Sequence, residues 1–331
     1  MTDSFHLTKS RFTSGLQCHK KLWWEVHEPD APELQPDKVL QDLFNQGHLV
    51  GVRARTRYPG GILIDLPYEA RDKRVAATQE ALKDGAPAIF EASFLANDTL
   101  VKIDVLEKIN DGYRLTEVKS SNSQKPEHIG DVAVQRSVAE ACGLKISETQ
   151  VLHLNGDFRH PDSGDLFAGT DVTAPVSTFL PQVPEEIARQ RAMLAGPIPS
   201  VPLGAQCFEP HECPFFTRCW PNSPDHIGNL AGVGPKKTVA YLARGIETIP
   251  QLPPNEKLNF TQKRQLKAMA ESRLVVEPTL ANALEPFTSA QRLGFLDFET
   301  ILRAIPVWPG MAPWQPAAAQ FSYHERQSDG T

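Results

Sequence analysis

Residues 100–121 read LVKIDVLEKINDGYRLTEVKSS, a pattern typical of two β-strands joined by a tight turn. The Asn-Asp-Gly signal at 110–112 separates two apolar runs, so we expect the strands to be antiparallel neighbours. Successive side chains of a strand point to opposite faces. Glu117 and Lys119 therefore share one face, and Val118 points the other way. A charged pair in this position is either a solvated strand face or part of a functional site.

The elements predicted around this hairpin form a mixed α/β core, with a central sheet and helices on its faces. The sequence predicts helices at 9–26, 37–57, 68–83 and 127–142, and strands at 62–66, 87–95, 100–109, 112–121 and 148–154. A compact helical unit at 226–274, a proline-rich linker at 278–287 and a last strand at 293–301 follow, with no closing element after 303. The predicted domains are 1–222, 223–277 and 278–331.

The composition is that of a globular chain: 331 residues, 40% hydrophobic and 22% charged. No apolar run of about 18 residues is present and the N-terminus lacks a secretory apolar region, so we expect a cytoplasmic protein without a membrane segment. The net charge of −6 argues against coating nucleic acid through bulk charge. Basic residues near the start, such as Lys9 and Arg11, are expected on the solvated surface, with a phosphate track as the alternative.

Asp104 interrupts the apolar run of its strand, where a core strand favours apolar residues. The hairpin brings it toward Glu117, and two carboxylates with water and a phosphate oxygen suit Mg²⁺ or Mn²⁺. A bound metal lowers the pKa of its water and neutralises charge that builds on a scissile phosphate. Lys119 would orient or deprotonate that water, or stabilise the developing negative charge.

Three further polar residues flank this pair. His48, on a helix before the sheet, completes the metal shell or is a surface or satisfied core histidine. Glu91 also breaks an apolar strand and is a further candidate ligand. Gln135, one turn beyond Asp131, hydrogen-bonds a phosphate, holds Lys119, or is an exposed helical residue without a function.

The order of His48, Asp104, the Glu117-Val-Lys119 segment and DVAVQ at 131–135 resembles the RecB-like branch of the PD-(D/E)XK nucleases. That branch includes the CRISPR-associated exonucleases and the nuclease domains of helicase–nuclease repair machines. The resemblance implies a restriction-endonuclease-like mixed sheet flanked by helices. It also implies roles for particular residues, namely metal ligands at His48, Asp104 and Glu117, a catalytic lysine at Lys119 and the family's helical glutamine at Gln135. The family's usual tyrosine near that glutamine is not evident here, since Arg136 and Ser137 stand where aromatic residues often do.

Four of the five cysteines form a second pattern: Cys18, Cys207, Cys213 and Cys219. Four thiolates hold either a tetrahedral zinc ion or a [4Fe–4S] cluster, and His19 and His211 are possible zinc substitutes. In the same RecB-like family, one N-terminal and three C-terminal cysteines are similar to an iron–sulfur clasp, and the resemblance implies that cluster here. The remaining Cys142 is predicted to be a buried core thiol.

Residues 230–246, LAGVGPKKTVAYLARGI, resemble a helix-hairpin-helix element. Gly232 and Gly234 would form its turn and expose backbone N–H groups to a DNA phosphate, with Lys236 and Lys237 adding charge. The alternative is an ordinary glycine-rich turn between two helices.

The segment FLDFET, with Asp297 and Glu299 on one strand face, resembles the first motif of an RNase H-like DEDD exonuclease. Two metals there need four carboxylates, and the later acidic motifs are not found before residue 331. We therefore expect a truncated second fold, a vestigial second site and no independent activity from it.

These observations favour a metal-dependent deoxyribonuclease that hydrolyses phosphodiester bonds at single-stranded DNA ends or flaps, in repair, recombination or defence. Its expected partners are DNA and other repair or defence proteins. Two alternatives remain: a DNA-binding scaffold with a weak site, and a zinc-stabilised structural module of a repair complex.

Overall fold

The computed structural model describes residues 7–67, 69–161 and 164–327. The chain divides into two compact units. Unit 1 comprises Met1–Val201 and Leu302–Gln315, and unit 2 comprises Pro202–Ile301 and Pro316–Thr331. The first division thus falls after Val201, whereas the sequence predicts it after residue 222.

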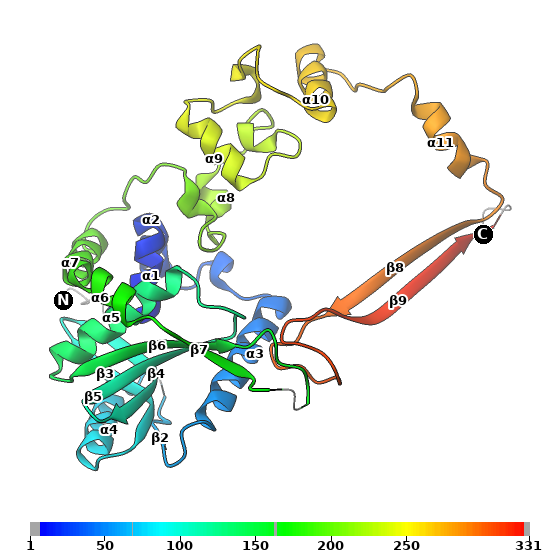
Figure 1. Ribbon diagram of the computed structural model, residues 1–331. Coiled ribbons are helices and arrows are strands. Elements are labelled where there is room, and N and C mark those ends of the chain that lie inside the picture. The colour runs from blue at the N-terminus through cyan, green and yellow to red at the C-terminus, as the bar shows by residue number, and fades with distance from the viewer. Residues whose placement is uncertain (1–6, 68, 162–163, 328–331) are drawn as a thin grey trace. The chain divides into compact units, whose positions relative to one another are not determined.

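A seven-stranded mixed sheet forms the centre of unit 1 (Figure 1). Its strands run in the order β2-β3-β4-β5-β6-β7, and β1 pairs in parallel with one end of β4. The strands are β1 Leu7–Thr8, β2 Ile62–Leu63, β3 Ala88–Ala96, β4 Thr99–Ile109, β5 Gly112–Lys119, β6 Ile146–Leu154 and β7 Phe167–Asp171. Strands β3, β4 and β5 are antiparallel neighbours, and β6 lies parallel to β5. The predicted hairpin and mixed α/β core are confirmed.

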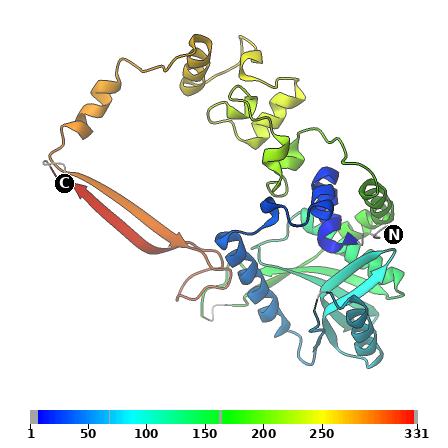
Figure 2. The same ribbon diagram turned by 180° about the vertical axis from the view of Figure 1, so that it is seen from behind.

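Helices cover both faces of this sheet (Figure 2). They are α1 Lys9–Gln17, α2 His19–His27, α3 Lys38–Arg55, α4 Arg71–Lys83, α5 Glu127–Ala141, α6 Thr173–Phe179 and α7 Val183–Leu194. Apolar side chains of α1, α2, α5 and α7 pack with the strands into the main core. On the other face, Val50 and Ala54 of α3 pack against Leu152 and Leu154 of β6. None of the described helices has the length and apolar character needed to cross a membrane.

The predicted helix over 9–26 is wrong in one respect, because it is two helices. Cys18 between them has extended backbone angles (φ −163°, ψ 121°), which end α1 and begin α2. The start of α1 is fixed by Thr8, whose side chain accepts a hydrogen bond of 3.2 Å from the Arg11 N–H. The sequence reading also missed β1, β7, α6 and α7.

Unit 2 contains α8 Phe216–Cys219, α9 Pro235–Ala243, α10 Phe260–Glu271, α11 Leu280–Thr288, β8 Leu293–Ile301 and β9 Ala317–Arg326. Its helical part has its own small core, in which Ile227, Leu230, Tyr241 and Ile249 are buried. This part confirms the predicted compact helical unit. The prediction of no closing element after residue 303 was wrong, because β9 pairs antiparallel with β8. The predicted linker at 278–287 is largely helical, because α11 occupies most of it.

Candidate metal centre

Asp104 and Glu117 occupy facing positions where the β4–β5 ladder ends. The last backbone pair of these strands is Val105 with Thr116, and the next position along would pair Asp104 with Glu117. In place of a strand carbonyl, Asp104 Oδ2 accepts the Val118 N–H at 2.8 Å. The chain thus brings the two carboxylates together by opening the ladder between them.

A kink in β3 and β4 changes which residues face the core on either side of Asp104. Ile89 and Ala92 of β3 both belong to the main core although they are three positions apart. In a regular strand, two residues separated by an odd number of positions point to opposite faces. Ile103 and Leu106 of β4 show the same spacing. Glu91, at the kink, has φ of 60°, in the left-handed region. A local irregularity of this kind re-aims a side chain, here Asp104.

Two lysines hold Glu117 from different elements. Lys119 Nζ lies 2.8 Å from Glu117 Oε1 and also pairs with Asp131 of α5. Lys9 Nζ, from the first residue of α1, lies 2.8 Å and 3.0 Å from the two Glu117 oxygens and 3.8 Å from Asp131 Oδ1. Lys9 was predicted on the surface, and the sequence reading gave Asp131 no role. No local pattern marks either residue as part of this site.

Gln135 is fully buried on α5, which excludes the exposed alternative considered for it. Its side-chain N–H donates to Glu117 Oε2 at 2.8 Å and to the Asp131 carbonyl at 3.0 Å. Gln135 therefore holds Glu117. The alternative in which Gln135 holds Lys119 is not observed, because Lys119 pairs with Asp131 instead.

The carboxylates of this cluster differ strongly in proton affinity. Burial, and then the charge of Glu117, raise the pKa of Asp104 to about 7. Burial alone would raise the pKa of Glu117, but Lys119 and Lys9 hold it well below its usual range. Burial would lower the pKa of Lys119, but Glu117 and Asp131 hold it above its usual range. Asp104 is thus about half protonated near pH 7, and a positive charge bound beside it would release that proton.

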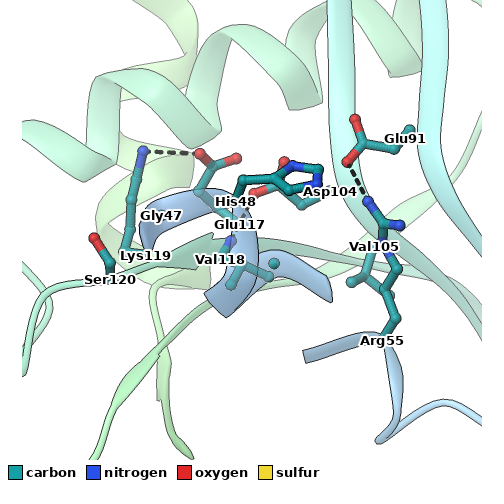
Figure 3. A pocket seen from close by; sticks show the side chains of 11 residues that line it. Gly47, His48, Arg55, Glu91, Asp104, Val105, Glu117, Val118, Lys119 and Ser120 are labelled. Atoms are coloured by element: carbon teal, nitrogen blue, oxygen red, sulfur yellow. Dashed lines mark hydrogen bonds and ion pairs between the residues drawn. The ribbon is translucent and has the colours of Figure 1, made fainter. Parts of the chain in front are cut away.

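A pocket of about 310 Å³ opens over these groups (Figure 3). Asp104, Glu117 and Lys119 line it, and His48 lines it from α3 as an exposed side chain. Glu91 also lines the pocket, but it is paired with Arg55 at 3.1 Å and with Lys102 at 2.7 Å. The structure therefore brings the predicted hairpin residues and His48 to one cavity.

The donor set of the pocket fits a hard divalent cation in its chemistry. Asp104 and Glu117 are oxygen ligands, and the crowding that raises the pKa of Asp104 is relieved by a bound positive charge. Within the described residues, no group of three or more His, Cys, Asp and Glu side chains is placed to hold a metal ion by itself. A cation here would keep water or phosphate oxygens, as Mg²⁺ commonly does.

The cysteine pattern is divided between the two units. Cys18 belongs to unit 1, and Cys207, Cys213 and Cys219 belong to unit 2. In the segment that holds the last three cysteines, Phe208, Phe216 and Trp220 are in mutual ring contact. The shared cluster stays a prediction. The prediction for Cys142 is wrong, because this residue caps the end of α5 and is exposed.

Gly232 and Gly234 lie in the turn that precedes α9, and Gly232 has φ of 68°. Lys236 and Lys237 follow in the first turn of α9 and are exposed. In β8, Asp297 and Glu299 are exposed and face Ser322 and Gln320 across the hairpin. DNA binding by the first group and a vestigial second site at the other stay predictions.

A family model described as a domain of unknown function (DUF2779) matches residues 294–331. No curated protein matches the chain. Among solved structures, the chain is similar to SSO0001, with 13% identity, a TM-score of 0.28 and coverage of 64% of this chain and 85% of that one. It is also similar to an alkaline exonuclease (LHK-Exo) from Laribacter hongkongensis, with 12% identity, a TM-score of 0.29 and coverage of 57% and 88%. Similarities of this strength carry no argument about the site, which rests on its own geometry.

Proposed function

We propose that the chain is a metal-dependent nuclease that hydrolyses phosphodiester bonds of DNA at the pocket of Asp104, Glu117 and Lys119. The observation that carries this proposal is the open ladder end, where two carboxylates and a charged lysine face one polar cavity. Asp104 and Glu117 would hold Mg²⁺ or Mn²⁺, and His48, which lines the same pocket, would have to move closer to become a third ligand. When bound, such a cation activates a water molecule and offsets charge on the scissile phosphate.

The chain's own residues divide the remaining work. Lys119 is held in its charged form, because Glu117 and Asp131 raise its pKa above the usual range. It therefore acts as a donor that stabilises negative charge on the phosphate, rather than as a base. Gln135 and the two lysines orient Glu117, so its oxygens are placed before substrate arrives.

The test is cleavage of end-labelled single- and double-stranded DNA by the full chain with Mg²⁺ or Mn²⁺. Lys119→Ala and Asp104→Asn are expected to lower the rate by at least about 100-fold, the scale of a lost electrostatic stabiliser. Lys83→Ala, which changes an exposed lysine at the end of α4, is the matched control and should cleave like wild type. Equal cleavage by wild type and Lys119→Ala would overturn the proposal. DNA binding without metal-dependent cleavage would favour the scaffold.

Two further parts of the proposal concern regions outside this pocket. The turn with Gly232 and Gly234, followed by Lys236 and Lys237, would contact the DNA backbone through N–H groups and positive charge. Cys18, Cys207, Cys213 and Cys219 would hold a [4Fe–4S] cluster. Iron and acid-labile sulfide in anaerobically purified protein would support the cluster. Stoichiometric zinc would instead favour the alternative in which these residues hold a zinc ion.

A further inference from the structure

Lys9 is bound to the Glu117 carboxylate, which a divalent cation would need as a ligand. Its ammonium is within 3.0 Å of both Glu117 oxygens, and the Glu117 side chain is only 2% exposed. A bidentate contact of this kind leaves few free positions on the carboxylate. An ammonium and a divalent cation therefore compete for the same oxygens.

The backbone delivers Lys9 to this place. Leu7 and Thr8 pair with Thr99 and Leu100 of β4, and the Leu7 side chain is fully buried. Thr8 then caps the helix that begins at Lys9. Lys9 is thus attached to the sheet that carries Asp104, so its position is a property of the fold.

The charges of the cluster explain why a second lysine is present. When fully ionised, Asp104, Glu117 and Asp131 supply three negative charges, and Lys9 and Lys119 supply two positive charges. If both lysines remain in the cluster, a divalent cation adds more positive charge than the three carboxylates can balance. The excess positive charge is balanced when a phosphate of the substrate enters, because each phosphodiester adds one negative charge.

We propose that Lys9 is a substrate-binding residue with two successive partners. Its ammonium neutralises Glu117 until a divalent cation displaces it, and it then binds a non-bridging oxygen of the scissile phosphate. This inference rests on the proposed function, since it assigns Lys9 to the substrate of the same site.

The displacement is tested without DNA, by titration calorimetry of the full chain with Mn²⁺. Lys9→Met removes the competing cation and should bind Mn²⁺ several-fold more tightly than wild type. Lys9→Arg keeps a competing charge and should bind like wild type, as should Lys83→Met on the exposed end of α4. Equal or weaker Mn²⁺ binding by a folded Lys9→Met, checked by circular dichroism, overturns the displacement.

The phosphate contact is tested by binding of a short single-stranded DNA in Ca²⁺ over a range of salt concentrations. Lys9→Met should reduce the slope of log K against log salt by about 0.7, the value for one single-strand phosphate contact, and Lys9→Arg should retain it. An unchanged slope in Lys9→Met overturns the phosphate role. If wild type fails to cleave while Lys9→Met still binds Mn²⁺ more tightly, the nuclease proposal fails and the displacement stands.

Discussion

The side-chain amide of Gln135 donates a 2.8 Å hydrogen bond to Glu117 Oε2, joining a buried helical residue to a strand residue 18 positions earlier. The carbonyl oxygen of the same amide is buried without a hydrogen-bond partner among the described residues. A buried unsatisfied oxygen costs free energy, so the amide is a poor choice for stability alone. We infer that its value lies in orienting Glu117.

Replacing Gln135 with Leu should therefore lower activity more than stability. Removing both the donor and the unsatisfied oxygen is expected to change the free energy of unfolding by less than about 1 kcal/mol. If Glu117 binds the metal as proposed, loss of this outer contact should lower the cleavage rate about 10- to 100-fold. Urea unfolding and DNA cleavage measure the two effects, with Gln41→Leu on the exposed face of α3 as control. Wild-type activity in Gln135→Leu would contradict the orienting role.

Glu91 should tolerate Gly better than Ala, the reverse of an ordinary strand position. Its φ of 60° is accessible to Gly without strain and costs other residues about 1 kcal/mol. Both substitutions remove the pairs with Arg55 and Lys102, so they differ only in the backbone. Urea unfolding should show Glu91→Gly more stable than Glu91→Ala by about 1 kcal/mol. At Lys108, an exposed residue of β4, the same pair should show the opposite order.

His128 should make the protein less stable in mild acid. Burial, and then the charge of Lys119, lower the pKa of His128 to about 4 from its usual 6.5. Its Nδ1 accepts the Lys125 N–H at 3.2 Å, a contact that protonation removes. Between these two pKa values the unfolded chain binds more protons, so stability is lost as pH falls from about 6.5 to about 4.

Between pH 7 and pH 5 this effect is roughly 1–2 kcal/mol, less than the full shift because pH 5 still lies above the pKa of His128 in the folded protein. Urea unfolding at pH 7 and pH 5 measures it. His128→Gln should remove much of the difference between the two pH values. His324→Gln, at an exposed residue of β9, should leave that difference unchanged. A pH dependence that survives in His128→Gln would assign the loss of stability to another group.

Lys236 and Lys237 should contribute to DNA affinity without sequence preference. Both are exposed in the first turn of α9. Changing both to Gln should weaken binding and reduce the salt slope by about 1.5, since each phosphate contact contributes about 0.7 to 0.9. Fluorescence anisotropy with two unrelated DNA sequences measures the change. The control is the double variant Lys263→Gln and Lys267→Gln, which changes two exposed residues of α10. An equal loss of DNA affinity in this control would contradict a specific role for Lys236 and Lys237.

The parts of the site that the sequence predicts are those set by local rules. A two-residue turn fixes which residues of β4 and β5 face each other, so the meeting of Asp104 and Glu117 follows from the pattern. Lys119 shares a face with Glu117 by alternation alone. The long helices α3 and α5 likewise follow from their apolar spacing.

The parts that escaped prediction depend on distant contacts or on strained backbone. Lys9 reaches Glu117 only because Leu7 pairs with Thr99, and no local pattern announces a two-residue strand. The kink at Glu91 reverses the alternation that a strand prediction assumes. The interruption at Cys18 lies inside a sequence with helical spacing on both sides.

The 108 positions between Lys9 and Glu117 also have a consequence for synthesis of the chain. At about 5 to 20 residues per second, a ribosome makes Lys9 between about 5 and 20 seconds before it makes Glu117. For most of that interval the nascent N-terminal segment lacks its strand partner in β4, and for all of it Lys9 lacks its charged partner in β5. The pocket is therefore assembled only after strands β4 and β5 have been made, so a growing chain lacks it until that point in translation.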